Sequence, residues 1–210
     1  MFLWRGFIDC ENTKGIFIMK CFVDIDGCIA NFILGCCKLH RYDYDKLMAS
    51  WPPGGGWDFF EMMGLTASDF YTGQGESFWS NLEWTPDGKQ ILQVAEDYFG
   101  QENVCLLTSP ILQAGSYSGK AKWVEKNLPQ YKRRLLIGAA KHFCAHPNVV
   151  LIDDSDKNIK DFRKEGGIGV TVPRLWNECF VERNNAVEFI KVEIPLQIYS
   201  AEGKKKNYEG

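Results

Sequence analysis

The stretch FVDIDG, from Phe22 to Gly27, decides the fold because it joins an apolar run to two carboxylates and a glycine. The run Cys21 to Ile25 predicts a short buried strand. Asp24 and Asp26 lie at its carboxyl end, and ligands bind outside that edge of open parallel sheets. Gly27 permits a tight turn there. Because Asp-Gly is also a common turn signal, this stretch alone supports a ligand site and a plain turn about equally.

Short apolar runs alternate with helical stretches along the rest of the chain. They are rich in Val, Ile and Leu, as strands buried on both faces usually are. Thr85 and Pro86 predict the start of one intervening helix, as N-cap and first helical residue, and Gly100 predicts its end. The expected strands after the first are Asn103–Leu107, Leu135–Ile137, Val149–Ile152 and Ile168–Val172. This alternation predicts an α/β fold, a Rossmann-like parallel sheet with helices on both faces.

Residues 33–84 interrupt the alternation. They contain a Pro-Pro-Gly-Gly-Gly run and, between Trp51 and Trp84, nine aromatic residues. This composition predicts a small, mainly helical cap inserted after the first strand, its aromatics forming a core or a base-stacking surface. The expected organisation is an N-terminal extension at 1–18, a core domain at 19–32 and 85–195, the cap at 33–84, and a C-terminal tail at 196–210.

A second acidic pair follows another predicted strand. Asp153 and Asp154 come directly after the run Val149–Ile152, so they should lie at the same sheet edge as the first pair. Carboxylates this close repel one another unless a cation compensates, and clustered oxygen ligands suit Mg²⁺. The competing interpretation is that one of the pair caps the helix expected from Asp156. The predicted metal ligands are Asp24, Asp26, Asp153 and Asp154.

Hydroxyl and ammonium groups follow the remaining strands. Thr108 and Ser109 end the second strand, where they can donate hydrogen bonds to a phosphate. Lys141 follows the third strand and can add positive charge at the same place. Lys120 is an alternative or additional phosphate-site lysine, although its position at the head of a helix also suits simple solvation.

These segments, taken in order, resemble the four sequence motifs of haloacid dehalogenase-like phosphatases. The motifs are FVDIDG at Phe22–Gly27, LLTSP at Leu106–Pro110, Lys141, and LIDD at Leu151–Asp154. The stretches VDIDGCIANF, FWSNLEWTPDG and KWVEKNL more closely resemble the 5′(3′)-deoxyribonucleotidase and C-type 5′-nucleotidase branch. The resemblance covers about residues 20 to 172 and is weak across Tyr42–Gly75.

The resemblance implies a mechanism and a metal. Asp24 would be the nucleophile that forms an aspartyl-phosphate, and Asp26 would protonate the leaving oxygen and then activate water. Mg²⁺ would be bound by Asp24, the backbone carbonyl of Asp26 and one or both of Asp153 and Asp154, with Asp154 favoured as the direct ligand.

The same resemblance implies how the substrate is held. Thr108 and Ser109 would bind the phosphate oxygens, and Lys141 would offset their charge. Phe78 and Trp79 align with the aromatic stretch near the nucleobase in the related nucleotidases, so they are the specificity candidates. The expected function is hydrolysis of (deoxy)nucleoside monophosphates. A phosphatase for a sugar phosphate or another small phosphoester, and an inactive interaction protein on the same fold, are the alternatives.

Composition excludes some other classes. The chain has 210 residues, a formal net charge of −3 and a sequence pI of about 5.7. That balance gives no general attraction to a nucleic-acid polymer. No apolar run has the length of a membrane span, and no signal peptide is apparent. The eight cysteines are expected to be reduced, which favours a cytoplasmic protein. The oligomeric state stays open, with a homodimer among the options.

Two groups of cysteine and histidine offered minor zinc alternatives. The first is Cys36, Cys37 and His40, which lacks paired C-x-x-C spacing. The second is His142, Cys144 and His146, in an expected loop. Packing or solvation is the simpler explanation for both.

Overall fold

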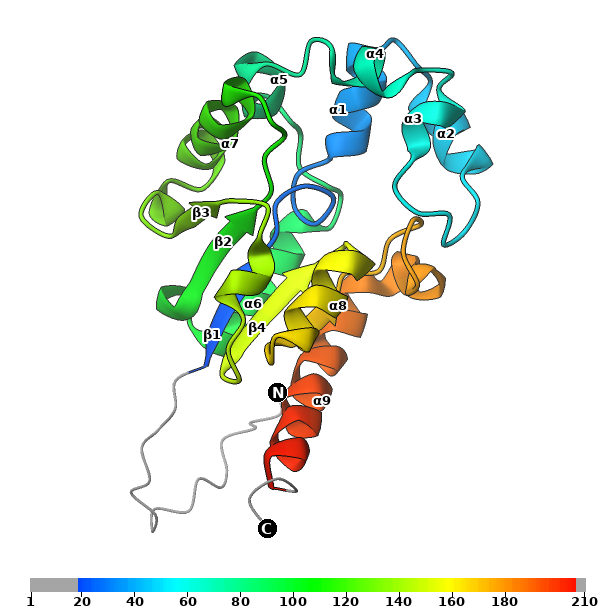
Figure 1. The fold of residues 1–210 in the computed structure, drawn as a ribbon. Coiled ribbons are helices and arrows are strands. Elements are labelled where there is room, and N and C mark those ends of the chain that lie inside the picture. Colours follow the sequence, from blue (N-terminus) through cyan, green and yellow to red (C-terminus); the bar gives the residue numbers. More distant parts are fainter. Residues whose placement is uncertain (1–18, 207–210) are drawn as a thin grey trace, which may run out of the picture.

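The computed structural model describes residues 19–206, and its centre is a parallel sheet of five strands (Figure 1). The strand order is β3-β2-β1-β4-β5. The strands are β1 (Lys20–Val23), β2 (Val104–Thr108), β3 (Leu135–Ile137), β4 (Val149–Asp153) and β5 (Ile168–Thr171). This confirms the predicted fold class. The strand β1 ends before Asp24, so both acids of the first motif lie in the loop beyond it.

Helices cover both faces of the sheet. Alternate strand residues point to opposite faces, and both sets are apolar, so each face must be buried. Leu106 and Ile152 belong to the larger core cluster, which includes residues of α6 (Gly88–Phe99), α7 (Ala114–Asn127) and α9 (Ala186–Lys206). Their sequence neighbours Leu107 and Leu151 face a smaller cluster with α8 (Asp156–Lys164). Short 3-10 helices are η1 (Gln101–Asn103), η2 (Pro129–Tyr131), η3 (Lys141–Cys144) and η4 (Phe180–Asn185).

The inserted segment is mainly helical and lies beyond the carboxyl ends of the strands (Figure 1). Its helices are α1 (Phe32–Leu39), α2 (Tyr44–Ser50), α3 (Phe59–Met62), α4 (Ala67–Tyr71) and α5 (Glu76–Ser80). Phe32, Phe59 and Phe70 are buried and meet in edge-to-face ring contacts. Seven of the nine aromatic residues from Trp51 to Trp84 belong to the larger core cluster or pack against it, so most of them build a core, one of the two roles expected for them.

The cap joins the core domain where α5 packs against α7. A glycine permits this close approach: a Cβ added at Gly119 would lie 2.5 Å from the Cβ of Trp79. The two helices thereby bring Trp79 beside Lys120 of α7, whose ammonium lies 4.3 Å from the centre of the indole ring. This packing places a cap residue directly against the site described below.

Two helix boundaries differ from the expected ones. Helix α6 begins at Gly88, with Asp87 as its N-cap. The prediction that Thr85 is the N-cap was wrong, because its hydroxyl instead donates to the carbonyl of Cys28 at 2.9 Å. Helix α9 continues to Lys206, past the boundary expected at residue 195, with Ile190 and Ile194 buried. The predicted extension 1–18 lies outside the described residues. Between residues 19 and 206, no helix has the length and apolarity needed to cross a membrane.

Candidate active site

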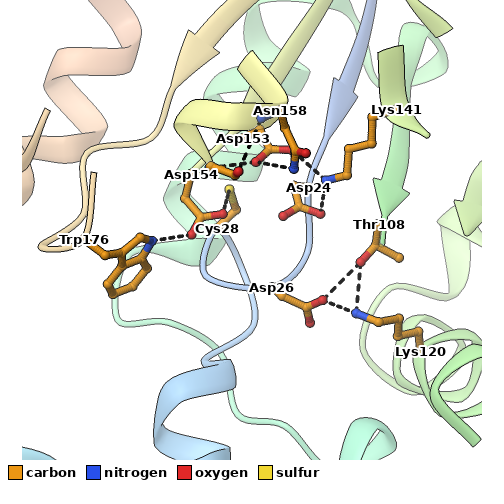
Figure 2. A network of polar contacts seen from close by, with 11 residues as sticks. Asp24, Asp26, Cys28, Thr108, Lys120, Lys141, Asp153, Asp154, Asn158 and Trp176 are labelled. Carbon is orange, nitrogen blue, oxygen red and sulfur yellow. Dashed lines mark hydrogen bonds and ion pairs between the residues drawn. The ribbon is translucent and has the colours of Figure 1, made fainter. Parts of the chain in front are cut away.

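The two acidic pairs lie side by side at one edge of the sheet. Strand β1 pairs with β4 in parallel, Val23 opposite Ile152, so the two strands end together. The amide of Asp24 continues the ladder by donating to the carbonyl of Ile152 at 2.9 Å. Figure 2 shows Asp24, Asp153 and Asp154 converging there. The structure thus brings together acids that are far apart in the sequence.

Lys141 lies between Asp24 and Asp153. Its ammonium is 2.6 Å from Asp24 Oδ1 and 2.6 Å from Asp153 Oδ2. Burial alone would lower the pKa of Lys141, but Asp153 and Asp24 together raise it above its usual value. Burial raises the pKa of Asp24 well above its usual value, although Lys141 opposes this shift. The lysine compensates only part of the negative charge gathered here.

Asp153 is fully occupied by protein donors. Besides Lys141, its carboxylate accepts from the amide of Ser155 at 2.8 Å and from Asn158 Nδ2 at 3.0 and 3.2 Å. Ser155 is the N-cap of α8, so Asp153 also helps to fix the start of that helix. The N-cap is thus Ser155, and the alternative that Asp153 or Asp154 caps this helix was wrong. This occupancy makes Asp153 a poor candidate for a direct metal ligand.

Asp154 has a different set of neighbours. The indole nitrogen of Trp176 donates to its Oδ2 at 2.7 Å, and the thiol of Cys28 lies 3.6 Å from its Oδ1. Its carboxylate also sits against Gly27, which has a φ of 75°, and a Cβ there would be 2.2 Å from Asp154 Oδ2. Burial and the nearby Asp153 raise the pKa of Asp154 to about 7.

These acids fit a divalent cation. Ligand atoms of Asp24, Cys28 and Asp154 lie within 4.8 Å of one another, and all three side chains are buried. Burial raises the pKa of Asp24 and of Asp154 because it disfavours the charged carboxylate, and a bound cation would offset that cost. Carboxylate oxygens are the ligands that Mg²⁺ prefers. The sequence interpretation missed Cys28, whose only signal was its place directly after the Asp-Gly turn.

A second cluster surrounds Asp26 (Figure 2). Lys120, only 1% exposed, forms an ion pair with Asp26 and donates to Thr108 Oγ1 at 3.1 Å. The Thr108 hydroxyl donates to Asp26 Oδ2 at 3.3 Å. The two lysines considered from the sequence therefore serve different acids, Lys141 with Asp24 and Lys120 with Asp26. Lys120 belongs to the site in addition to Lys141.

A cavity of about 500 Å³ opens over these groups. Asp24, Asp26, Lys141, Asp154 and Ser109 contribute to its polar part. Its aromatic wall is formed by Phe32, Trp57, Phe70, Tyr71, Trp79 and Trp176. Of the two specificity candidates, only Trp79 lines this cavity. Phe78 lies at a separate depression beside Leu34 and Leu82, because successive residues of α5 point in different directions.

Arg174 was also missed by sequence reasoning. Its guanidinium donates to the carbonyls of Gly27 at 2.7 Å and Cys28 at 3.0 Å, and it forms an ion pair with Asp87. It thereby fixes the loop that carries the first acidic pair. In the sequence its only signal was a position in the loop Pro173–Asn177, just after the last strand.

The minor zinc alternatives find no support in the described part of the chain. His40 is used in a contact of its Nε2 with the carbonyl of Phe70 at 3.0 Å. Among residues 19–206, the cluster of three potential ligands is Asp24, Cys28 and Asp154. Neither predicted Cys/His group assembles such a cluster there.

Comparison with known proteins gives a distant likeness of fold. No family model matches the chain, and no curated protein matches it. A HAD family enzyme from Bacteroides thetaiotaomicron, in complex with magnesium and inorganic phosphate, is 18% identical over 75% of this chain and 95% of its own, with a TM-score of 0.40. A predicted phosphatase from Clostridium acetobutylicum is 13% identical over 80% and 91%, with a TM-score of 0.47.

A HAD family hydrolase from Deinococcus radiodurans, with bound phosphate and sodium, has a TM-score of 0.49. It is 10% identical over 80% of this chain and 88% of its own. These values are too low to transfer an activity to this chain.

Proposed function

We propose that this protein is a Mg²⁺-dependent phosphomonoesterase of the haloacid dehalogenase-like type, with Asp24 as its nucleophile. One observation carries the proposal: Asp24, Asp26 and Asp154 meet two buried lysines beneath a single cavity. The resemblance of the four motifs, in the same order along the chain, supports the same chemistry. The intact set of acids and lysines argues against the inactive interaction protein.

Asp24, Asp154 and the backbone carbonyl of Asp26 would hold the metal ion. When bound, Mg²⁺ supplies positive charge that offsets the charge on the phosphate oxygens and on the buried acids. Asp153 takes a supporting part, since Lys141 and Asn158 already occupy its oxygens. The oxygen-rich ligand set favours Mg²⁺ over softer ions, with Cys28 at its margin.

The reaction proceeds in two displacements. A carboxylate oxygen of Asp24 attacks phosphorus, the bond to the leaving oxygen breaks, and Asp26 gives that oxygen its proton. Asp26 then accepts a proton from water, which attacks the aspartyl-phosphate, releases phosphate and restores Asp24. Lys141 keeps the Asp24 carboxylate oriented through the 2.6 Å contact. Lys120 and Thr108 hold Asp26. Ser109 lines the cavity, and its hydroxyl would donate a hydrogen bond to the phosphate.

The substrate class we favour is a nucleoside 5′- or 3′-monophosphate. The aromatic wall, with the exposed rings of Trp57 and Tyr71 among its residues, offers flat apolar surface to a base. The resemblance to the nucleotidase branch supports the same class. A sugar phosphate is the nearest rival, because the polar floor of the cavity would bind any small phosphomonoester.

Phosphate release from a panel of esters tests this proposal. The panel contains nucleoside 5′- and 3′-monophosphates and hexose phosphates, each assayed with Mg²⁺ and with a chelator. The expected result is Mg²⁺-dependent release, fastest from a nucleotide and lost in Asp24→Asn. Preference for a sugar phosphate would refute the proposed substrate class. No release of phosphate from any ester would refute the proposed phosphatase activity.

A further inference from the structure

We propose that Trp176 is a positioning residue through which the cap loop 51–57 holds the Asp154 carboxylate in the orientation that binds the metal ion. This inference rests on the proposed function for the presence of the ion. It concerns a contact outside the four motifs, and it makes metal affinity depend on how the cap is seated.

The contact with Asp154 is short and nearly buried. Trp176 Nε1 donates to Asp154 Oδ2 at 2.7 Å, and the Asp154 side chain is 3% exposed (Figure 2). Among the described residues, this indole is the N–H donor to the carboxylate, and Oδ1 is approached by the Cys28 thiol at 3.6 Å. One oxygen is thus held by the indole, while the other has no N–H donor among the described residues. The bond also fixes the rotation of the carboxylate.

The cap loop holds the indole from the other side. The Trp176 ring lies 5.5 Å from the ring of Trp51 and 5.2 Å from that of Trp57, measured between centroids. The backbones are joined as well, because Gly54 N donates to Leu175 O at 2.8 Å and Gly56 N donates to Trp176 O at 3.2 Å. A shift of the cap loop must therefore move the indole or break these contacts.

The core anchors the loop Pro173–Asn177, which carries Trp176. Asn177 Nδ2 donates to the carbonyl of Asp154 at 2.9 Å and to that of Val172 at 2.7 Å. These bonds fix the main chain around Asp154, whereas Trp176 acts on its carboxylate. Cap and metal ligand are therefore connected through one side chain that touches both.

Hydrogen-bond partners of metal ligands commonly change metal affinity by about 10- to 100-fold when they are removed. We therefore expect Trp176→Phe, which keeps a ring but loses the N–H donor, to weaken Mg²⁺ binding by about 10-fold or more. Trp57→Ala leaves the donor in place but removes a cap ring behind it. It should weaken binding in the same direction by a smaller factor.

The test is calorimetric titration of the metal-free protein with Mg²⁺, which needs no turnover. Trp84→Phe is the matched control, because Trp84 is also half-buried and donates its indole N–H, to Asn127 Oδ1 at 3.3 Å, away from the acids. This control should bind Mg²⁺ as the wild type does. Thermal unfolding of each metal-free variant separates a loss of affinity from a loss of structure.

Equal Mg²⁺ affinity in wild type and Trp176→Phe would overturn the proposal, and unchanged affinity in Trp57→Ala would overturn its cap part. If Trp176→Phe does not fold, β-(3-benzothienyl)alanine at position 176 gives the test, since it keeps the indole's shape without the donor. A wild type that binds no Mg²⁺ would instead refute the proposed function. The two failures are therefore distinguishable.

Discussion

The ammonium of Lys141 lies 2.6 Å from the carboxylate of Asp24, and both side chains are almost wholly buried. In a medium of low effective dielectric constant, the attraction within such an ion pair is strong. Removing one partner is costly in free energy, because the other charge is then buried without compensation. The same ammonium contacts Asp153, so one cation stabilises two acids. This arrangement orients Asp24 before any substrate or metal ion arrives.

Removal of this lysine should destabilise the protein. Lys141→Met leaves Asp24 and Asp153 buried without their cation, so the free energy of unfolding should fall by about 3 to 5 kcal/mol. Lys160→Met is the control, since Lys160 pairs with Glu178 at the exposed surface, where solvent screens the pair, and its loss should change stability little. Urea unfolding in the presence of a chelator measures both, and equal effects would contradict the account.

Loss of the proposed acid should depend on the leaving group. Asp26→Asn should slow turnover of an alkyl phosphate by about 100-fold or more, because an alkoxide needs a proton to depart. p-Nitrophenolate departs without one, so its first release should be affected much less and should appear as a burst. Rapid-mixing assays with both esters measure the difference. The same loss in the first step for both esters would exclude Asp26 as the acid.

Alanine variants of two glycines should distinguish the effect of backbone strain from that of contact with Asp154. Gly27 has a φ of 75° and Gly64 a φ of 72°, but only at Gly27 would a Cβ meet Asp154, at 2.2 Å from Oδ2. Both alanine variants should lose about 1 to 3 kcal/mol of stability through strain. Gly27→Ala should in addition displace the carboxylate and weaken Mg²⁺ binding. Calorimetry and urea unfolding test this, and unchanged Mg²⁺ affinity in Gly27→Ala would contradict it.

The metal-free protein should lose stability as the pH rises. Burial, reinforced by Asp153, raises the pKa of Asp154 to about 7, against about 3.9 in an unfolded chain. The folded state then binds the proton more tightly, so this contribution is present below about pH 4 and is lost as the pH rises to about 7.

Asp154→Asn has no titrating group at this position and is the reference. The free energy of unfolding of the wild type, minus that of Asp154→Asn, should fall between about pH 4 and 7 in a chelator, and Mg²⁺ should restore it at pH 7. Urea unfolding at several pH values measures the difference. A difference that stays constant or rises would contradict the shifted pKa.

The sheet and the meeting of the acids could be predicted from the sequence. Each strand is a short run of branched apolar residues, and parallel strands place their carboxyl ends at one edge. Asp24 and Asp154 follow two such strands, so their convergence needs only that the strands be neighbours, as β1 and β4 are. The sequence did not predict which strands are neighbours; the strand order comes from the structure.

The contacts of the loops could not be predicted in this way. Cys28 and Trp176 reach Asp154 through irregular backbone, whose path depends on tertiary contacts and not on a periodic pattern. Phe78 was misplaced because its direction depends on where α5 begins, and a shift of one residue turns a helical side chain by about 100°. The sequence also could not show which lysine pairs with which acid, because the directions of the Lys120 and Lys141 side chains depend on tertiary contacts.

Chemical trapping of the phosphorylated residue tests the central claim most directly. Borohydride reduces an acyl phosphate to an alcohol, so an aspartyl-phosphate formed during turnover of a nucleoside monophosphate would be recovered as homoserine in peptide mass spectrometry. If Asp24 is the nucleophile, this conversion occurs at position 24, only with substrate and Mg²⁺ present, and does not occur in Asp24→Asn. Turnover without conversion at position 24, or conversion at another acid, would contradict it.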